Sequence, residues 1–209
     1  MDDAMAWKLT HEARASTAEV FGTLSAHQWA APSLCGDWTV KIAAAHIVAG
    51  AEQTTGSFLK GLVSSGLRFN TFMDRQARAI AQVDTSELIE RLAARTTTTN
   101  KAPAPVVTML GEVVTHTEDI TRPLGLAHTV DPDALAACLD LYKLANFPVG
   151  AKRRVAGLSL VASDLAWHSG EGPTVEGPGL SLLLAITGRR AGLEGLGGDG
   201  VATLAARLS

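Results

Sequence analysis

The hydrophobic pattern of the first 125 residues is typical of helices separated by loops rich in breakers. Apolar residues recur at helical spacing, and Thr39 stands where it can cap the second helix. Thr85 or Ser86 can cap a later one, and Pro123 ends the last because proline cannot continue the hydrogen-bond ladder. The helices predicted in this part of the chain span 5–26, 39–53, 70–82, 85–97 and 105–121. Their short connections indicate an antiparallel helical bundle.

After Gly125 the pattern changes to a mixture of helix and short strands. A proline in the first turn opens a helix, and a partly alternating segment is followed by turn-rich sequence. We expect helices over 131–146, 178–190 and 200–208, and strands over 155–162 and 173–177. The fold class predicted is therefore mainly α, with a helical bundle over 1–127 and a small α/β domain over 128–209.

Composition and charge exclude several classes of protein. Of the 209 residues, 46% are hydrophobic, which is enough for a real core and excludes intrinsic disorder. The 18 basic and 21 acidic side chains give a net charge of −3. The chain has no dense basic cluster, which argues against nucleic acid as its main partner. No apolar run approaches the roughly 20 residues that span a membrane.

The N-terminus and the cysteines indicate the compartment. The first five residues are acidic, whereas a signal peptide needs a basic start and an apolar centre. Cys35 and Cys138 lie far apart and form neither a disulfide framework nor a CxxC pair. We therefore expect a reduced, cytoplasmic protein, monomeric or homodimeric, with no nucleic acid or membrane partner.

The helix over 105–121 places a carboxylate and an imidazole on a hydrophobic stripe. Steps of three and four along its inward face give Met109, Glu112, Val113, His116 and Ile120. Glu112 and His116 are four residues apart, so they project from one face, one turn apart. An unpaired buried carboxylate costs several kcal/mol, and a cation is a usual remedy.

The helix over 39–53 carries a matching histidine. His46 is the one strongly polar residue on a face otherwise made of Ile42, Ala45 and Ala49. If the two helices pack together, His46 meets Glu112 and His116. Two histidines and one glutamate are the ligand set of a catalytic zinc site with an open fourth position. The alternatives are a satisfied core histidine and an ordinary contact between residues four apart on a helix.

Several segments together resemble the mycothiol-dependent maleylpyruvate isomerase family, within the DinB-like metalloenzyme superfamily. The resemblance covers residues 10–205 and is strongest in two segments, LCGDWTVKIAAAH over 34–46 and EVVTHTEDITRPLG over 112–125. Shorter matches are DLAW over 164–167 and GEGP over 170–173, with Gly177-Pro178 and Gly188-Arg189 at the end.

The resemblance implies a DinB-like four-helix bundle followed by a small α/β domain. It implies that a divalent metal, usually zinc, is held by His46, Glu112 and His116, the same three residues that periodicity selects. Asp119 would orient a ligand, and Arg122 would pair with an anionic group of thiol or substrate. The alternative for these two is an Asp119–Arg122 salt bridge at the end of the helix.

The chemistry implied is activation of a low-molecular-weight thiol by zinc. A free thiol is mostly protonated at neutral pH, and coordination removes its proton. In the family the thiol is mycothiol of actinobacteria, which attacks an electrophilic carbon. The sequence therefore favours a mycothiol-dependent S-transferase or isomerase acting on a small electrophile. The alternatives are a non-catalytic metal- or ligand-binding protein of the same fold and a zinc hydrolase that uses bound water.

Two further expectations concern residues outside this ligand set. Cys35 is interpreted as a buried small apolar residue rather than a nucleophile. The C-terminal domain is expected to be shorter than in maleylpyruvate isomerases proper, so that four arginines have no matched role in substrate handling, namely Arg153, Arg154, Arg189 and Arg190.

Overall fold

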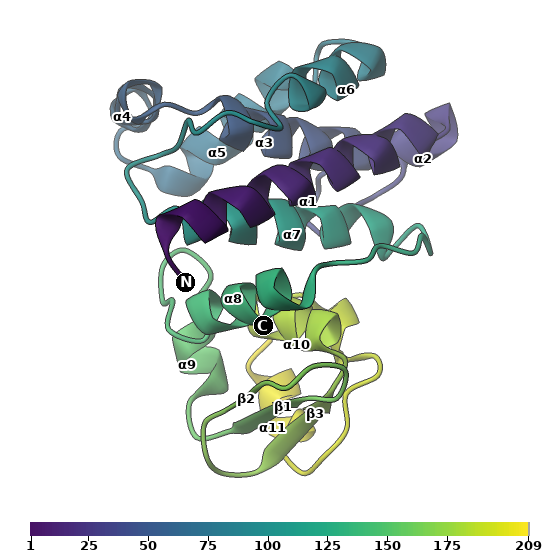
Figure 1. Ribbon diagram of the computed structural model, residues 1–209, viewed down its shortest axis with the longest axis vertical. Coiled ribbons are helices and arrows are strands. Elements are labelled where there is room, and N and C mark those ends of the chain that lie inside the picture. The colour runs from purple at the N-terminus through teal and green to yellow at the C-terminus, as the bar shows by residue number, and fades with distance from the viewer. Residues whose placement is uncertain (209) are drawn as a thin grey trace. The chain divides into compact units, whose positions relative to one another are not determined.

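The computed structural model describes residues 1–208, and these form two compact units, one over Met1–Thr129 and a second that begins at Val130 (Figure 1). No helix among the described residues is both long and apolar enough to cross a membrane.

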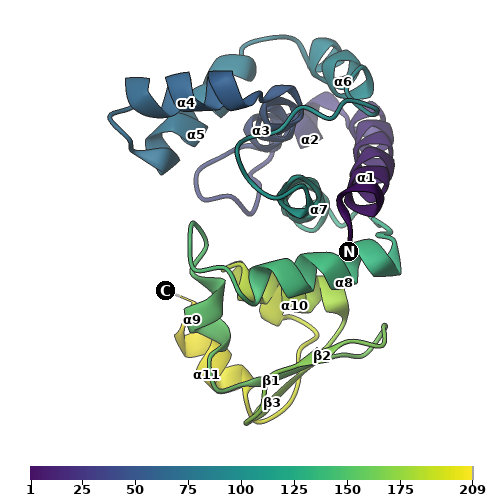
Figure 2. The same cartoon turned by 60° about the vertical axis from the view of Figure 1, so that its left-hand side comes forward.

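The first unit is built on four helices that pack around one core. They are α1 (Asp3–Thr23), α3 (Val40–Glu52), α6 (Thr85–Ala93) and α7 (Val107–Thr121). Helix α7 packs between α1 and α3, and α6 closes the bundle between the same two helices. Figure 2 looks nearly along the bundle and shows the four helices close to end-on. Helices α1 and α7 run in one direction and α3 and α6 in the other (Figure 1), so the α1–α6 and α3–α7 pairs are antiparallel.

The core explains why these segments form helices. Their inward faces supply a continuous apolar cluster, and burying such a stripe stabilises a helix more than propensity does. Alanines of α3 let neighbouring helices approach it closely. The fully buried members of the cluster include Phe21, Val40, Ala43, Ala44, Ala45, Val48, Leu88, Leu92 and Ile120.

Helix caps fix where the helices begin, and one differs from the prediction. The Thr39 side chain caps α3 by accepting a hydrogen bond from the Ile42 N–H, as expected. Helix α6 instead has Asp84 at its N-cap, so Thr85 is already its first helical residue. Helix α7 ends at Thr121, two residues before Pro123, as predicted.

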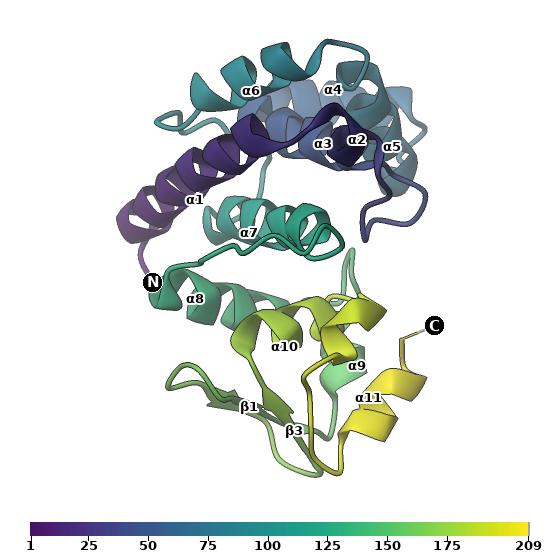
Figure 3. The same cartoon turned by 90° about the vertical axis from the view of Figure 1, so that its right-hand side faces the viewer.

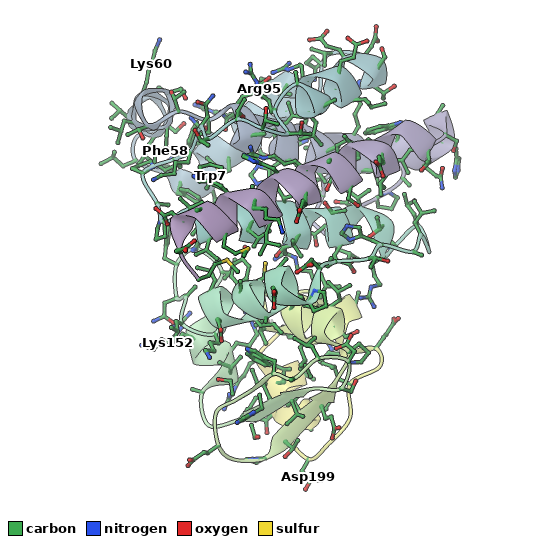
Figure 4. All side chains as sticks on the ribbon, viewed as in Figure 1. Trp7, Phe58, Lys60, Arg95, Lys152 and Asp199 are labelled. Carbon is green, nitrogen blue, oxygen red and sulfur yellow. The ribbon has the colours of Figure 1, made fainter. Side chains whose placement is uncertain are left out.

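Three further helices complete the first unit. They are α2 (Ala26–Ala30), α4 (Thr55–Ser64) and α5 (Phe69–Ile80). The sequence pattern missed α4 because its glycines weaken the helical signal. The missing side chain of Gly61 leaves room for the Phe72 ring of α5, because a Cβ atom there would overlap that ring unless it moved. Phe58 packs edge-on against the same ring, whereas Lys60 points into solvent (Figure 4).

The second unit packs helices against a small sheet. Its elements are α8 (Pro132–Tyr142), α9 (Ala151–Val155), β1 (Ser159–Ala162), β2 (His168–Ser169), β3 (Thr174–Gly177), α10 (Gly179–Ile186), the 3-10 helix η1 (Arg190–Leu193) and α11 (Val201–Ala206). The strand order is β2-β1-β3, with β2 antiparallel and β3 parallel to β1. Helix α10 is almost wholly buried and contacts α8, η1, β1 and β3 (Figure 3).

A helical bundle comes first along the chain and a small α/β unit follows it, as predicted. This confirms the expected fold class. The segment DLAW over 164–167, which the sequence analysis singled out, makes two structural contacts. The Asp164 carboxylate accepts a hydrogen bond from the Gly179 N–H at the start of α10, and the Trp167 indole N–H donates to Asp140.

Candidate metal centre

The antiparallel packing of α3 and α7 brings together the three residues that the sequence singled out. His46 lies on the inward face of α3, and Glu112 and His116 lie one turn apart on α7. The His46 Nε2 atom is 3.2 Å from Glu112 Oε2, and the His116 Nε2 atom is 3.5 Å from the same oxygen. The two imidazole rings meet edge to face. Three donor atoms therefore converge on one point of the bundle.

The spacing of the three atoms fits a metal ion. Each donor lies within 4.8 Å of the others. Bonds of about 2.0–2.2 Å from zinc to nitrogen or oxygen separate tetrahedral ligands by roughly 3.4 Å, close to the 3.2 and 3.5 Å observed between imidazole and carboxylate. Two imidazoles and one carboxylate are also a donor set that zinc prefers. The residues present therefore fit a divalent metal.

The cluster is buried on its histidine side and open on its glutamate side. The exposed fraction of the side chain is 9% for His46 and 14% for His116, but 42% for Glu112. The Nδ1 atom of His46 is buried and has no hydrogen-bond partner among the described residues. The solvent-exposed part of the cluster is therefore the Glu112 side chain.

The electrostatics make the cluster a strongly coupled unit. Burial lowers the pKa of His46, and its hydrogen bond to Glu112 does not reverse that effect. Burial also lowers the pKa of His116, but Cys35, Asp119 and Glu112 outweigh it, so the pKa lies well above its ordinary value. Partial removal from water raises the pKa of Glu112, and the two histidines reverse this and hold that pKa far below its usual range. The ionised carboxylate is ready to bind a cation.

Asp119 lies behind His116, on the side away from Glu112. Its Oδ2 atom is 2.8 Å from His116 Nδ1, and its side chain is fully buried. A carboxylate on one imidazole nitrogen fixes the tautomer and directs the other nitrogen outward. This contact fits the orienting role that the resemblance implied for Asp119.

Cys35 has contacts that the sequence did not predict. Its side chain was expected to be a buried small apolar group, but it is partly exposed and its S–H donates to Asp119 Oδ2 at 2.8 Å. The sulfur also lies 3.3 Å from His116 Nδ1. Cys35, His116 and Asp119 therefore form a second group of potential metal ligands, which shares His116 with the first. No local pattern indicates this, because the loop meets α7 only in the folded chain.

Trp38 supports the other histidine. Its ring lies 5.2 Å from the imidazole of His46, and its indole N–H donates to Asp74 of α5 at 2.9 Å. Arg78 binds Asp74 as well and reaches Asp37 in the same loop. The loop before α3 is thus fastened to α5 next to the cluster.

Arg122 pairs with a carboxylate that lies one turn before it on α7. Its guanidinium is 3.1 Å from Glu118, four residues earlier. His128 shares the Glu118 carboxylate through Nδ1 at 3.1 Å. These contacts place the Arg122 guanidinium and the His128 imidazole on one buried carboxylate, that of Glu118, near the end of α7.

Comparison with known proteins gives one family. A family model described as the mycothiol maleylpyruvate isomerase N-terminal domain matches residues 10–121, which include every residue of the cluster. A comparison with curated proteins finds no match.

Two solved structures share the fold. A crystal structure of the mycothiol-dependent maleylpyruvate isomerase has a TM-score of 0.65 and 14% sequence identity, covering 95% of this chain and 93% of its own. The structure of a histidine-to-alanine mutant of that enzyme gives a TM-score of 0.61 at the same identity and coverage. This coverage corrects the expectation of a shortened C-terminal domain, because the similarity extends over nearly the full length of both chains.

Proposed function

This chain belongs to the mycothiol maleylpyruvate isomerase family, and we propose that it is a metal-dependent enzyme that activates mycothiol for attack on a small electrophile. The observation that carries the proposal is the convergence of His46 Nε2, His116 Nε2 and Glu112 Oε2 on one point between α3 and α7. These three side chains would hold the metal. The half-exposed side of Glu112 would admit the thiol.

Zinc bound by these residues would favour the thiolate form of a coordinated thiol, since coordination lowers the pKa of the sulfur. The residues of the chain supply the other requirements. Asp119 holds the Nδ1 proton of His116, which leaves Nε2 free to bind. Burial of His46 keeps its imidazole neutral, which is the form that binds a metal.

The thiol would add to an electrophilic carbon of the substrate. In an isomerisation, rotation about the former double bond and elimination return the thiol unchanged. In a transfer, the adduct is the product. Both outcomes need the same positioned nucleophile, and the cluster supports either.

A turnover assay separates the proposal from its alternatives. Zinc-loaded protein is incubated with a chlorinated aromatic or bimane electrophile, with and without mycothiol. The proposal predicts consumption that requires both thiol and metal and is abolished in Glu112→Gln. Activity without any thiol would favour a hydrolase with metal-bound water, and metal binding without turnover on any electrophile would favour a binding protein.

A further inference from the structure

The sulfur of Cys35 lies beside the cluster without facing its three donor atoms. We propose that Cys35 is a positioning residue, which holds Asp119 against His116 and thereby fixes the direction of His116 Nε2. This inference rests on the proposed metal site and adds a residue to it that the sequence pattern had assigned to packing.

The first step is that Asp119 serves two donors with one oxygen atom. Its Oδ2 accepts from His116 Nδ1 at 2.8 Å and from the Cys35 S–H at 2.8 Å. The sulfur and Nδ1 are 3.3 Å apart, so the three atoms form a closed triangle. A carboxylate held at two points cannot rotate away from the imidazole as readily as one held at a single point.

The second step is that the loop binds Asp119 through its backbone as well. The Leu34 N–H donates to the Asp119 carbonyl oxygen at 3.0 Å, one residue before the sulfur contact. Leu34 and Cys35, which are consecutive in the loop, therefore bind the main chain and the side chain of Asp119 respectively. The last turn of α7 and the loop before α3 act as one unit at this point.

The third step is that the loop is itself well fixed. The Cys35 N–H donates to the Ser33 hydroxyl at 3.1 Å, and the Ser33 N–H donates to the Trp38 carbonyl at 2.9 Å. A β-bridge joins Pro32 to Thr39 at the base of the loop. The indole of Trp38 is fastened to Asp74. The thiol is thus presented to Asp119 by a closed loop.

The position of the sulfur argues for action through Asp119. It lies beside Nδ1, whereas the metal-facing nitrogen, Nε2, points to Glu112 on the opposite side of the ring. A metal held by His46, Glu112 and His116 Nε2 would be separated from Cys35 by the imidazole. Outer contacts of this kind typically change metal affinity by about 10–100-fold when they are removed.

The test compares Cys35→Ala, which removes the donor, with Cys35→Ser, which keeps an O–H donor of similar size. Zinc affinity is measured by chelator competition on the full chain. We expect Cys35→Ala to bind zinc about 10–100-fold more weakly than the parent protein, and Cys35→Ser to recover most of that loss. Cys138→Ala, which removes the second cysteine and lies outside the helices that carry the cluster, is the matched control and should bind zinc like the parent.

Melting curves recorded without metal show whether each variant is folded. If Cys35→Ala does not fold, alkylation of Cys35 in folded Cys138→Ala protein removes the same S–H donor and should weaken zinc binding equally. Parent-like affinity in Cys35→Ala would overturn the positioning role and leave the metal site intact.

The absorption spectrum of the Co²⁺-loaded protein tests the other alternative. A sulfur-to-cobalt charge-transfer band in the absence of added thiol, lost in Cys35→Ser, would overturn the proposal by making Cys35 a ligand. A parent protein that binds no zinc or cobalt would overturn the proposed function itself, and with it this inference.

Discussion

The imidazole rings of His46 and His116 meet edge to face with their centroids 4.6 Å apart, although 69 residues of sequence separate them. Both direct Nε2 toward the same oxygen of Glu112. Two neighbouring imidazoles that share one ionised carboxylate are an arrangement that a divalent cation would stabilise, and the predictions below follow from it.

Removing either histidine should lower metal content and thermal stability together. A metal that binds only the folded state stabilises it by mass action, by about 2.7 kcal/mol at a free concentration one hundred times the dissociation constant. We expect His46→Ala and His116→Ala to lose the metal measured by elemental analysis and the rise in melting temperature on adding zinc. The exposed His27→Ala is the control. Full metal occupancy in both variants would contradict the site.

Metal affinity should fall as the pH is lowered. The pKa of His116 is raised above its ordinary value in the metal-free protein, so at low pH a proton occupies the nitrogen that binds the metal. Below that pKa the apparent affinity should decrease by up to about tenfold per pH unit. Zinc titrations at several pH values test this, and an affinity that is independent of pH would argue against imidazole ligation.

The two cysteines should differ in reactivity in the folded protein. Cys138 is fully buried, and burial raises the pKa of its thiol to about 12, which leaves almost no thiolate at neutral pH. Cys35 is partly exposed. Mass spectrometry after brief alkylation should find the label on Cys35, with Cys138 labelled only after denaturation. Rapid labelling of Cys138 would contradict the packing of α8.

Among the charged residues of α1, Arg14 should lower the stability most when it is replaced by alanine. It is buried and donates to the carbonyl oxygens of Arg95 and Thr98, which follow α6. Arg14→Ala leaves both acceptors without this donor and should lower the free energy of unfolding by about 2–4 kcal/mol. The exposed Lys8→Ala should change it by less than about 1 kcal/mol. Urea denaturation measures both, and equal effects would refute the role of Arg14.

The sequence predicted those features that depend on local periodicity. His46, Glu112 and His116 each interrupt an apolar stripe, so a helical repeat of 3.6 residues was enough to select them. The start of α3 followed from Thr39 and the end of α7 from Pro123, because helix capping and the effect of proline are also local.

Features that depend on packing between distant segments were not predictable. The contact of Cys35 with Asp119 joins residues 84 positions apart, and neither carries a local signal for it. Helix α4 was missed because Gly61 weakens the helical signal, and the contact that favours a small residue there is with the distant Phe72 ring.

Under the proposed function, a metal held by His46, Glu112 and His116 binds the sulfur of the thiol cosubstrate. The most direct measurement is the absorption spectrum of Co²⁺-loaded Cys35→Ser protein titrated with mycothiol, since this variant removes the nearest sulfur of the chain itself. The account predicts that a thiolate-to-cobalt charge-transfer band appears and saturates at one thiol per metal. A cobalt spectrum that does not change on adding mycothiol would contradict it.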